Sequence, residues 1–388
     1  MKKTRLLKLI NSLFLLMLLS SCSGKELEHI LYVHAIGIDY VDDKYVAFIQ
    51  FIEFGAIAKQ EGGRKEATSN WIGKAEGLSF DMATDHLYRS TQQRVSWGLI
   101  KSLIFTERAL KQPGLVEEVV DVLNRYNEIR HTIYTFGTSS YVENIFNDTP
   151  ILNLSPFYSQ LSDPEDIYEQ YSIIQPIMLH RLLSHWYDSS TTVFIPFLGT
   201  NDYQWIEKGR PHSALEMNGI GAITDGKYKG FFERDEVLGL RWVQKGTKRS
   251  PVYLYKNNKI VASVVAKEPQ AKITYKKEGE EVIFDVGVNC NVSIIEMREP
   301  MSVEEITDLT KKEIKKQIRE MYVMGLEKES DLLNLEYTLY KNDPNLYNKL
   351  SKNEDFFLHK DSLGKIKVDV SILTSGKSKM KKEKNSSE

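Results

Sequence analysis

The chain has 388 residues, of which 41% are hydrophobic and 27% are charged, a composition typical of a folded globular body. Its formal net charge is -2, from 51 basic and 53 acidic residues, so no strong field of either sign favours binding to nucleic acid. Only two cysteines occur, Cys22 and Cys290, which excludes a disulfide framework and a CxxC zinc or redox site. Stability must therefore come from packed cores.

The first 21 residues have the profile of a secretory signal. A basic start precedes a largely apolar stretch at 9–19, which ends in the small residues Ser20 and Ser21. The basic residues are Lys2, Lys3, Arg5 and Lys8. A bilayer crossing takes about 20 apolar residues, so this stretch is too short for a plain membrane span. We predict that residues 1–21 are a signal peptide.

The tetrapeptide Leu19-Ser20-Ser21-Cys22 resembles the lipobox of bacterial lipoproteins. We expect the Cys22 thiol to receive diacylglycerol and its freed amine to be N-acylated, and we predict no other cofactor. The alternative is an unmodified cysteine beside an ordinary cleavage site. Because each buried CH₂ contributes about 0.8 kcal/mol, two or more acyl chains hold a protein durably on a bilayer. Without the four basic residues of the signal, 47 basic and 53 acidic residues are left, so the mature body is mildly acidic.

Strand and helix patterns alternate through residues 22–148, which we predict to form an N-terminal α/β domain. Two β-rich runs, Tyr32–Ile38 and Tyr45–Phe51, flank Asp42-Asp43-Lys44 and predict a hairpin, followed by a loop over 55–68. Later spacings predict strands at Ile100–Phe105 and Thr132–Phe136, and helices that begin behind Ser79, behind Thr106, near Val116 and at a capping box, Ser140–Glu143.

The pattern loosens over residues 149–215, which contain prolines at positions 150, 156, 164, 176 and 196. An acidic turn, Ser162–Asp166, precedes a helix predicted over Met178–Trp186. We interpret this middle region as a connection between domains rather than as part of a core.

A sharper β pattern returns in residues 216–376, which we predict to form a C-terminal domain of a sheet with helices. Apolar residues alternate over Phe284–Ile294 and again over Ile366–Ile372, and shorter strands are predicted at Lys259–Val265 and Ala271–Tyr275. A helix opens at the capping box Ser302–Glu305 and is predicted to stop at Gly325. Residues 377–388 are rich in lysine, and we expect a basic disordered tail. The whole chain is therefore predicted to be a multidomain α+β protein with mixed or antiparallel sheets.

No catalytic or metal-binding motif emerges, and we predict no catalytic, cofactor-binding or metal site. Gly219–Thr224 resembles the start of a dinucleotide loop but has Thr224 where a third small residue belongs. His180 and His185 are five residues apart and would point about 140° from one another on a helix. Cys290 lies on the apolar face of its predicted strand, as a buried thiol does. The remaining candidates for a groove are Tyr168, Glu169 and Tyr171, for which packing is the alternative explanation.

A set of dispersed residues forms a further pattern. It consists of Gly37-Ile38-Asp39, Lys101–Glu107 with Ala109, Leu123–Arg125 with Glu128–Arg130, Asn218–Ala222, Gly230, Glu236, Gly239-Leu240, Trp242, Glu296, Ser330–Leu332 and Pro344. Together with the lipobox, their order and spacing resemble the Ger(x)C family of spore germination lipoproteins, the C subunits of germinant receptors. The chain departs from that family at Leu99, often a histidine, and at Tyr347, which lies where a tryptophan is usual.

The resemblance implies a non-enzymatic subunit of three mixed α/β domains on the outer face of the spore inner membrane. It also implies assembly with A-type and B-type membrane subunits that respond to nutrients, with a small-molecule germinant as a further ligand and no nucleic acid. The alternative is a solute-binding lipoprotein of a membrane importer, which needs two α/β lobes with near-continuous buried parallel strands. Such strands are not evident in the sequence. A surface hydrolase is a third class, and it lacks a recognisable acid, base and nucleophile.

Overall fold

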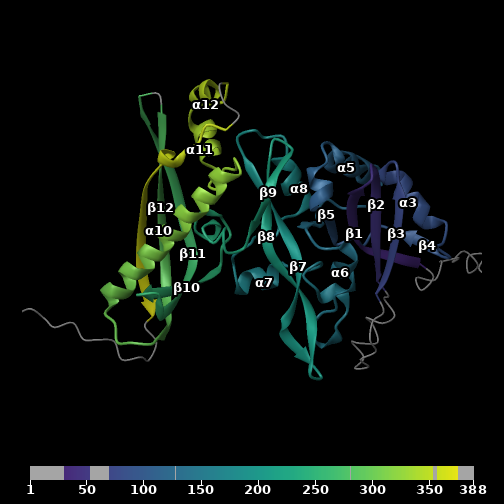
Figure 1. Cartoon of the computed structure of the whole chain (residues 1–388), viewed down its shortest axis with the longest axis horizontal. Helices are drawn as coiled ribbons and strands as arrows, with labels where there is room; N and C mark the ends of the chain where they lie inside the picture. Colours follow the sequence, from purple (N-terminus) through teal and green to yellow (C-terminus); the bar gives the residue numbers. More distant parts are fainter. Residues whose placement is uncertain (1–29, 53–69, 127, 280, 353–355, 375–388) are drawn as a thin grey trace, which may run out of the picture.

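The computed structural model describes residues 30–52, 70–126, 128–279, 281–352 and 356–374. The predicted signal peptide, the lipid site Cys22, the loop at 55–68 and the tail at 377–388 lie outside the described residues. Two β-sheets stand side by side, one of nine strands from the first part of the chain and one of four strands from the last part (Figure 1). Helices pack on both sheets, which confirms the predicted α+β class.

The larger sheet has a parallel centre and antiparallel edges. Its spatial order is β3-β2-β1-β5-β6-β7-β8-β9, with β4 paired to β1. The strands are β1 (Ile30–Val41), β2 (Lys44–Ile52), β3 (Trp71–Gly77), β4 (Arg94–Ser96), β5 (Ser102–Thr106), β6 (Tyr134–Thr138), β7 (Thr192–Glu207), β8 (Arg210–Thr224) and β9 (Lys227–Glu233). The predicted hairpin is confirmed, because Asp42 and Asp43 turn between β1 and β2 with φ angles of 50° and 57°. Strand β5 is buried along its whole length between parallel neighbours, so the inference that such strands are missing is wrong.

Short helices accompany this sheet. They are α3 (Phe80–Tyr88), α4 (Glu107–Lys111), α5 (Leu115–Arg125), α6 (Val142–Asn147), η2 (Ile151–Asn153), η3 (Pro156–Tyr158), α7 (Glu165–Gln170) and α8 (Leu179–Ser184). Two predicted N-caps are confirmed, since the Ser79 hydroxyl accepts a hydrogen bond from the Met82 amide and the Thr106 hydroxyl accepts one from the Ala109 amide.

The capping box predicted at Ser140 is wrong. Helix α6 begins after Tyr141, and no side chain caps it. The Ser140 amide donates instead to the Thr138 hydroxyl at 3.0 Å. Val142, the first residue of the helix, packs where a Cβ on Gly37 would overlap it. A tertiary contact that needs glycine therefore fixes the start of α6, and the local motif does not.

The middle region is more than a connection. Residues 149–215 contain all of β7 and the start of β8, and the predicted boundary at 215/216 falls inside β8. Pro196 misled the interpretation, because proline cannot donate to a ladder. It is tolerated here because β7 pairs with β6 only at Gly137 and Phe197, so most of that edge of β7 carries no ladder. The nine-stranded sheet is thus nearly divided between β6 and β7.

The smaller sheet is mixed and carries the longest helix. Its order is β10-β11-β12-β13, and only the β12–β13 pair is parallel. The elements of this part are α9 (Leu240–Val243), β10 (Arg249–Lys256), β11 (Lys259–Glu278), β12 (Glu281–Met297), α10 (Val303–Glu327), α11 (Leu335–Asn342), α12 (Pro344–Ser351), η4 (Lys360–Ser362) and β13 (Leu363–Thr374). The capping box of α10 is confirmed, since the Ser302 hydroxyl accepts from the Glu305 amide and the Glu305 carboxylate accepts from the Ser302 amide. The two predicted short strands are one strand, β11, and the helix continues past Gly325 to Glu327.

One apolar core joins the two sheets. It contains Ile220 of β8 and Phe232 of β9 from the larger sheet, together with Trp242 of α9. The same cluster includes Val288 of β12 and Ile318 of α10, and all five side chains are essentially buried. Because their burial stabilises both parts at once, the two sheets form a continuous body.

A buried histidine ties the middle region to the larger sheet. His34 of β1 is fully buried, and its Nδ1–H donates to Gln50 Oε1 at 2.7 Å. The Gln50 amide donates in turn to the Phe146 carbonyl, which fixes the orientation of that amide. The Ser162 hydroxyl then donates to His34 Nε2 at 2.5 Å. Burial lowers the pKa of His34 to about 4, with a smaller lowering by Lys101, so the neutral ring is the folded form.

Acid should therefore destabilise the protein through His34. The pKa of an unfolded histidine is about 6.5, so the unfolded chain binds this proton first as the pH falls. The contribution is present in full above pH 6.5 and is lost down to about pH 4, with an upper value of about 3 kcal/mol. In urea titrations over this range, His34→Gln should flatten the decline in the free energy of unfolding. His180→Gln, at an exposed histidine, is the control. Equal slopes for both variants would contradict this role of His34.

Candidate functional site at the junction of the sheets

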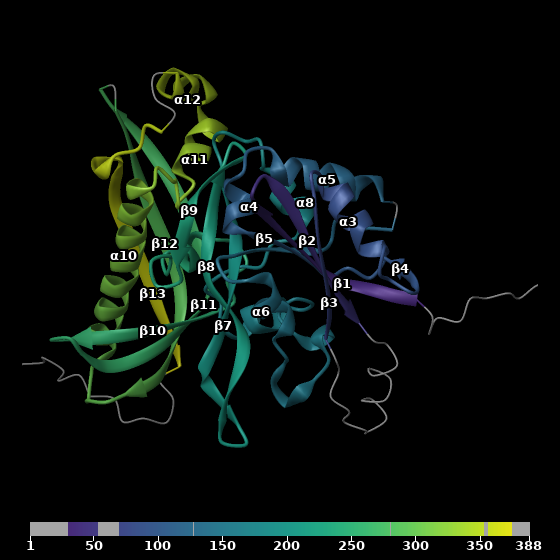
Figure 2. The ribbon, with the colours of Figure 1, turned by 45° about the vertical axis from the view of Figure 1, so that its right-hand side comes forward.

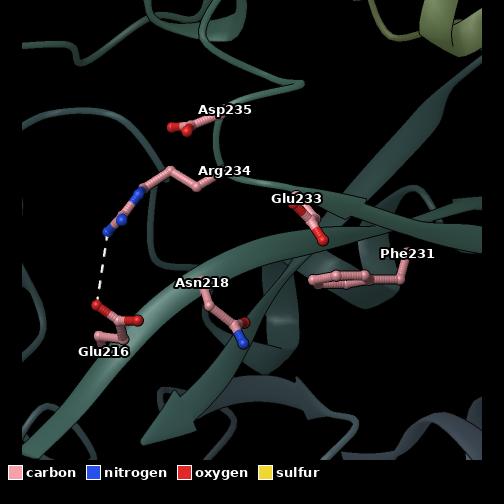
Figure 3. A pocket seen from close by; sticks show the side chains of 6 residues that line it. All are labelled: Glu216, Asn218, Phe231, Glu233, Arg234 and Asp235. Carbon is pink, nitrogen blue, oxygen red and sulfur yellow. Dashed lines mark ion pairs between the residues drawn. The ribbon is translucent and has the colours of Figure 1, made fainter. Parts of the chain in front are cut away.

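A small polar pocket lies between β8 and the loop that connects β9 to α9. Its volume is about 230 Å³, and its lining residues are Glu216, Asn218, Phe231, Glu233, Arg234 and Asp235. Figure 3 shows Arg234 reaching from the loop after β9 toward Glu216 on β8, with Nη1 and Oε2 3.7 Å apart. The same Glu216 oxygen accepts a hydrogen bond of 3.1 Å from the amide of Asn201, a buried residue of β7. The polar groups of this pocket thus connect three successive segments.

Glycines let these segments approach. A Cβ on Gly199 of β7 would overlap the Asn218 amide, and a Cβ on Gly219 would overlap the Phe232 carbonyl of β9. The turn out of β9 is held by two further bonds. Arg234 N donates to the Asn218 carbonyl at 2.8 Å, and Glu233 N donates to the Glu236 carboxylate at 2.8 Å. Three positions that carried the family resemblance, Asn218, Gly219 and Glu236, therefore shape this turn.

A buried network of hydrogen bonds joins helix α9 to α10. A Cβ on Gly239 would lie 2.8 Å from the Gln317 carbonyl, so the two helices are nearly in backbone contact. The Gln317 side-chain oxygen accepts from Trp242 Nε1 at 2.8 Å and from Arg241 Nη2 at 2.9 Å. Arg241 Nη1 also donates to the Pro251 carbonyl at 2.8 Å. Burial lowers the pKa of Arg241 to about 10, which leaves it charged at neutral pH.

A second set of contacts joins the sheets beside α11. The Asn334 side chain pairs with the Thr192 backbone of β7 in both directions, accepting from its amide at 2.8 Å and donating to its carbonyl at 3.2 Å. Lys328 Nζ donates to the Phe231 carbonyl at 2.5 Å, beside the Phe232 ring. These contacts come from the two turns that follow α10, so this segment is held against β7 and β9 of the larger sheet.

Two carboxyl groups are buried in the same segment. Asp331 accepts hydrogen bonds from the Leu333 amide at 3.2 Å and the Glu336 amide at 2.7 Å, and so holds the entry into α11. Glu336 is equally buried, and desolvation together with the Asp331 charge raises its pKa well above the ordinary value. Asp331, one of the family positions, thus serves a helix start.

Two family positions of the N-terminal part, Asp39 and Thr106, form a separate cluster. Asp39 is buried at the end of β1 and accepts from the Thr106 hydroxyl at 2.5 Å. Its carboxylate also accepts from Arg108, with Nη2 and Oδ2 2.5 Å apart. The hydrogen bonds that Arg108 donates to Asp39 raise the pKa of Arg108, as expected for a paired guanidinium. The cluster fixes α4 against β1, so its role is again one of packing.

The candidates singled out for chemistry do not come together. Tyr168 is buried, whereas Glu169 and Tyr171 are exposed, so the three do not line one groove. His180 Nδ1 bonds the His131 carbonyl, and His185 lies 3.9 Å from Asp188. Cys290 is buried, as predicted, and desolvation raises its pKa to about 11. Leu99 is 40% exposed, whereas Tyr347 is packed edge-on against Tyr340 and Phe357.

Two observations apply to the part of the chain that the structure describes. None of its helices is long and apolar enough to cross a membrane. No three side chains among its His, Cys, Asp and Glu residues gather in a way that suits a metal ion.

The fold is that of a solved structure, the GerBC protein. The chain superimposes on the crystal structure of the GerBC protein with a TM-score of 0.54 and 16% identity, covering 87% of this chain and 96% of that one. Residues 23–200 match the family model for the spore germination protein N-terminal domain, and residues 218–376 match the model described as spore germination B3/GerAC like, C-terminal. The chain belongs to the Ger(x)C family of spore germination proteins. A search of curated protein sequences finds no match.

Proposed function

We propose that this chain is the C subunit of a spore germinant receptor. Lipid on Cys22 holds it on the outer face of the spore inner membrane, where it acts through contact with A-type and B-type membrane subunits. One observation carries the proposal: the positions of the family pattern build joints, at Asp39 and between α9 and α10, rather than a reaction centre. A rigid tethered body needs only weak contacts, because the tether keeps it concentrated beside its neighbours.

We infer a non-enzymatic role from the state of the ionisable groups. In the junction pocket, Arg234 faces Glu216, and Glu216 is bonded to Asn201, so these charges satisfy one another. The Cys290 thiol is buried with a raised pKa and is therefore a poor nucleophile. These groups support the fold, and a signal would pass through the body as a change in its contacts.

The importer hypothesis fits the structure less well. A solute-binding lipoprotein captures its ligand between two lobes that face each other across an opening. Here the facing surfaces are filled by one core, in which Ile220 and Phe232 of the larger sheet pack with Val288 of the smaller one. The presence of buried parallel strands such as β5 removes one argument against that hypothesis, but the shared core provides a stronger one.

The proposal predicts loss of function when the lipid site is removed. Spores whose only copy carries Cys22→Ala should respond to nutrients as poorly as spores that lack the chain, because the body is no longer held at the membrane. The rate of germination against a panel of amino acids and sugars measures this effect. Cys290→Ala, which leaves the tether intact, is the matched control. Normal germination of Cys22→Ala spores that contain the chain at ordinary levels would contradict the proposal.

A further inference from the structure

The hairpin of β7 and β8 extends beyond the body. Residues 202–211 are all exposed, and they include Tyr203 (72%), Trp205 (47%) and Ile206 (74%). In Figures 1 and 2, which are related by a turn about the vertical axis, this hairpin tip lies below every labelled element. Large apolar side chains on a projecting tip contribute nothing to the core, so they indicate a surface that something else covers.

The hairpin is built to hold this tip in place. Lys208 and Gly209 form a tight turn with φ angles of 51° and 79°, the geometry of a two-residue β-hairpin. At its base, His212 donates to the Thr149 carbonyl at 3.1 Å, and Ser213 donates to Asp148 at 2.8 Å. These two hydrogen bonds hold the base of the hairpin, so the tip projects in a fixed direction.

A buried asparagine connects the tip to the junction pocket. The Asn201 side-chain oxygen accepts from the amides of Tyr203 and Gln204, and it thereby holds the irregularity where β7 gains extra residues over β8. Its amide donates to Glu216, the partner of Arg234. Hydrogen bonds and one ion pair therefore connect the tip of the hairpin to the turn that leads into α9.

The arrangement of the apolar side chains favours lipid over a protein partner. Successive residues of a strand point to opposite faces, so Trp205 and Ile206 lie on the two sides of the ribbon. They pair across the hairpin with His212 and Pro211 respectively. A protein that docked on one face would leave the other apolar side chain in water. A lipid surface that the tip enters end-on covers both, and tryptophan and tyrosine are the side chains that favour the membrane–water interface.

The length of the tether and the charge of the turn also favour contact of the tip with lipid. Seven residues lie between Cys22 and Ile30, and the eight steps from one to the other span at most about 29 Å when extended. A 16-residue strand such as β7 is about 53 Å long. The tether is shorter than this strand, so it keeps the start of β1 close to the bilayer. At the turn, Lys208 and Arg210 outnumber Glu207, which lies 3.7 Å from Lys208, so residues 207–210 carry a net charge of +1 that attracts anionic headgroups.

We propose that the tip of the β7–β8 hairpin enters the interfacial region of the bilayer on which the chain is tethered. The inference rests on the proposed function for the tether, and it adds a second attachment point. Two points of contact restrict the orientation of the body above the membrane more than a single tether does.

Tryptophan fluorescence tests this inference without depending on natural lipidation. A chain of residues 22–388 contains every described element and can be coupled through Cys22 to a maleimide phospholipid, because the Cys290 thiol is buried with a raised pKa. Vesicles of phosphatidylglycerol and phosphatidylethanolamine are prepared with and without bromine on the acyl chains, since bromine quenches only nearby indoles. Trp97, Trp186 and Trp242 are buried, so Trp71 and Trp205 are the exposed reporters.

We expect brominated lipid to lower the emission, and Trp205→Phe to abolish most of that loss. Trp71→Phe, at the other exposed tryptophan, should preserve it. Ile206→Asp should also reduce the quenching, while Ile295→Asp, at another exposed isoleucine on β12, should not. Quenching that survives Trp205→Phe would overturn the inference. So would a loss of germination in Ile206→Asp spores without any change in quenching, because that result would assign the tip to a protein partner. Failure of Cys22→Ala to affect germination is a separate outcome that concerns the tether alone.

Discussion

Trp242→Ala should lower the free energy of unfolding by about 3–5 kcal/mol. The Trp242 ring is fully buried in the core shared by the two sheets, its Nε1 donates to Gln317, and the Arg241 guanidinium lies 4.9 Å from its centre. Truncation removes these contacts and leaves a cavity between α9 and α10 that close-packed neighbours fill only in part. Urea denaturation followed by circular dichroism measures the loss.

Trp71→Ala provides the control for that experiment. Trp71 is 68% exposed at the start of β3, so the same truncation there should cost about 1 kcal/mol or less. Similar losses for the two variants would mean that Trp242 does not pack in a shared core. The junction would then be looser than the structure indicates.

Gln317→Leu should cost about 3–5 kcal/mol, although leucine is close in size to glutamine. The Gln317 side-chain oxygen accepts from both Arg241 and Trp242, and the change leaves two buried donors, one of them charged, without that acceptor. Gln317→Glu keeps an acceptor beside the guanidinium but loses the amide that donates to Glu313 at 3.0 Å, so it should be less destabilised than Gln317→Leu without recovering the full stability. Urea denaturation at neutral pH measures the difference between the two variants.

A double variant identifies the cause. Arg241→Met combined with Gln317→Leu removes the stranded charge, so the pair should be less destabilised than the sum of the two single variants. Additive losses would show that the guanidinium and the amide do not depend on one another. In that case the cost of Gln317→Leu would reflect packing alone.

Local signals in the sequence predicted most of the secondary structure. Alternation revealed β12 and β13, the Asp42-Asp43 turn revealed the first hairpin, and the capping box at Ser302 placed the start of α10. These features depend on neighbours in the chain, and the sequence displays such neighbours directly.

Long-range contacts were harder to predict. The start of α6 depends on Gly37, which is 105 positions from Val142, and β7 was missed because Pro196 is tolerated only where the neighbouring edge is unpaired. A local signal for its hairpin did exist, since Lys208-Gly209 follows a run rich in aromatic and β-branched residues.

The junction pocket could not have been found in this way. Asn201, Glu216 and Arg234 are ordinary polar residues that gain meaning only when β7, β8 and the loop after β9 are brought together. The dispersed family positions indicated where to look, because Asn218, Gly219 and Trp242 all lie at this junction. They did not reveal that its role is to join the sheets.

Co-isolation from spore membranes tests the central claim most directly. An affinity tag on the C-terminal tail of the full chain allows its capture from mild detergent extracts, and the amounts of A-type and B-type subunits captured with it can be measured by quantitative mass spectrometry. The account predicts that both subunits accompany the wild-type chain and the Cys290→Ala control, and that both are lost from the Cys22→Ala variant. Capture of the wild-type chain without either subunit, from spores that contain all three, would contradict it.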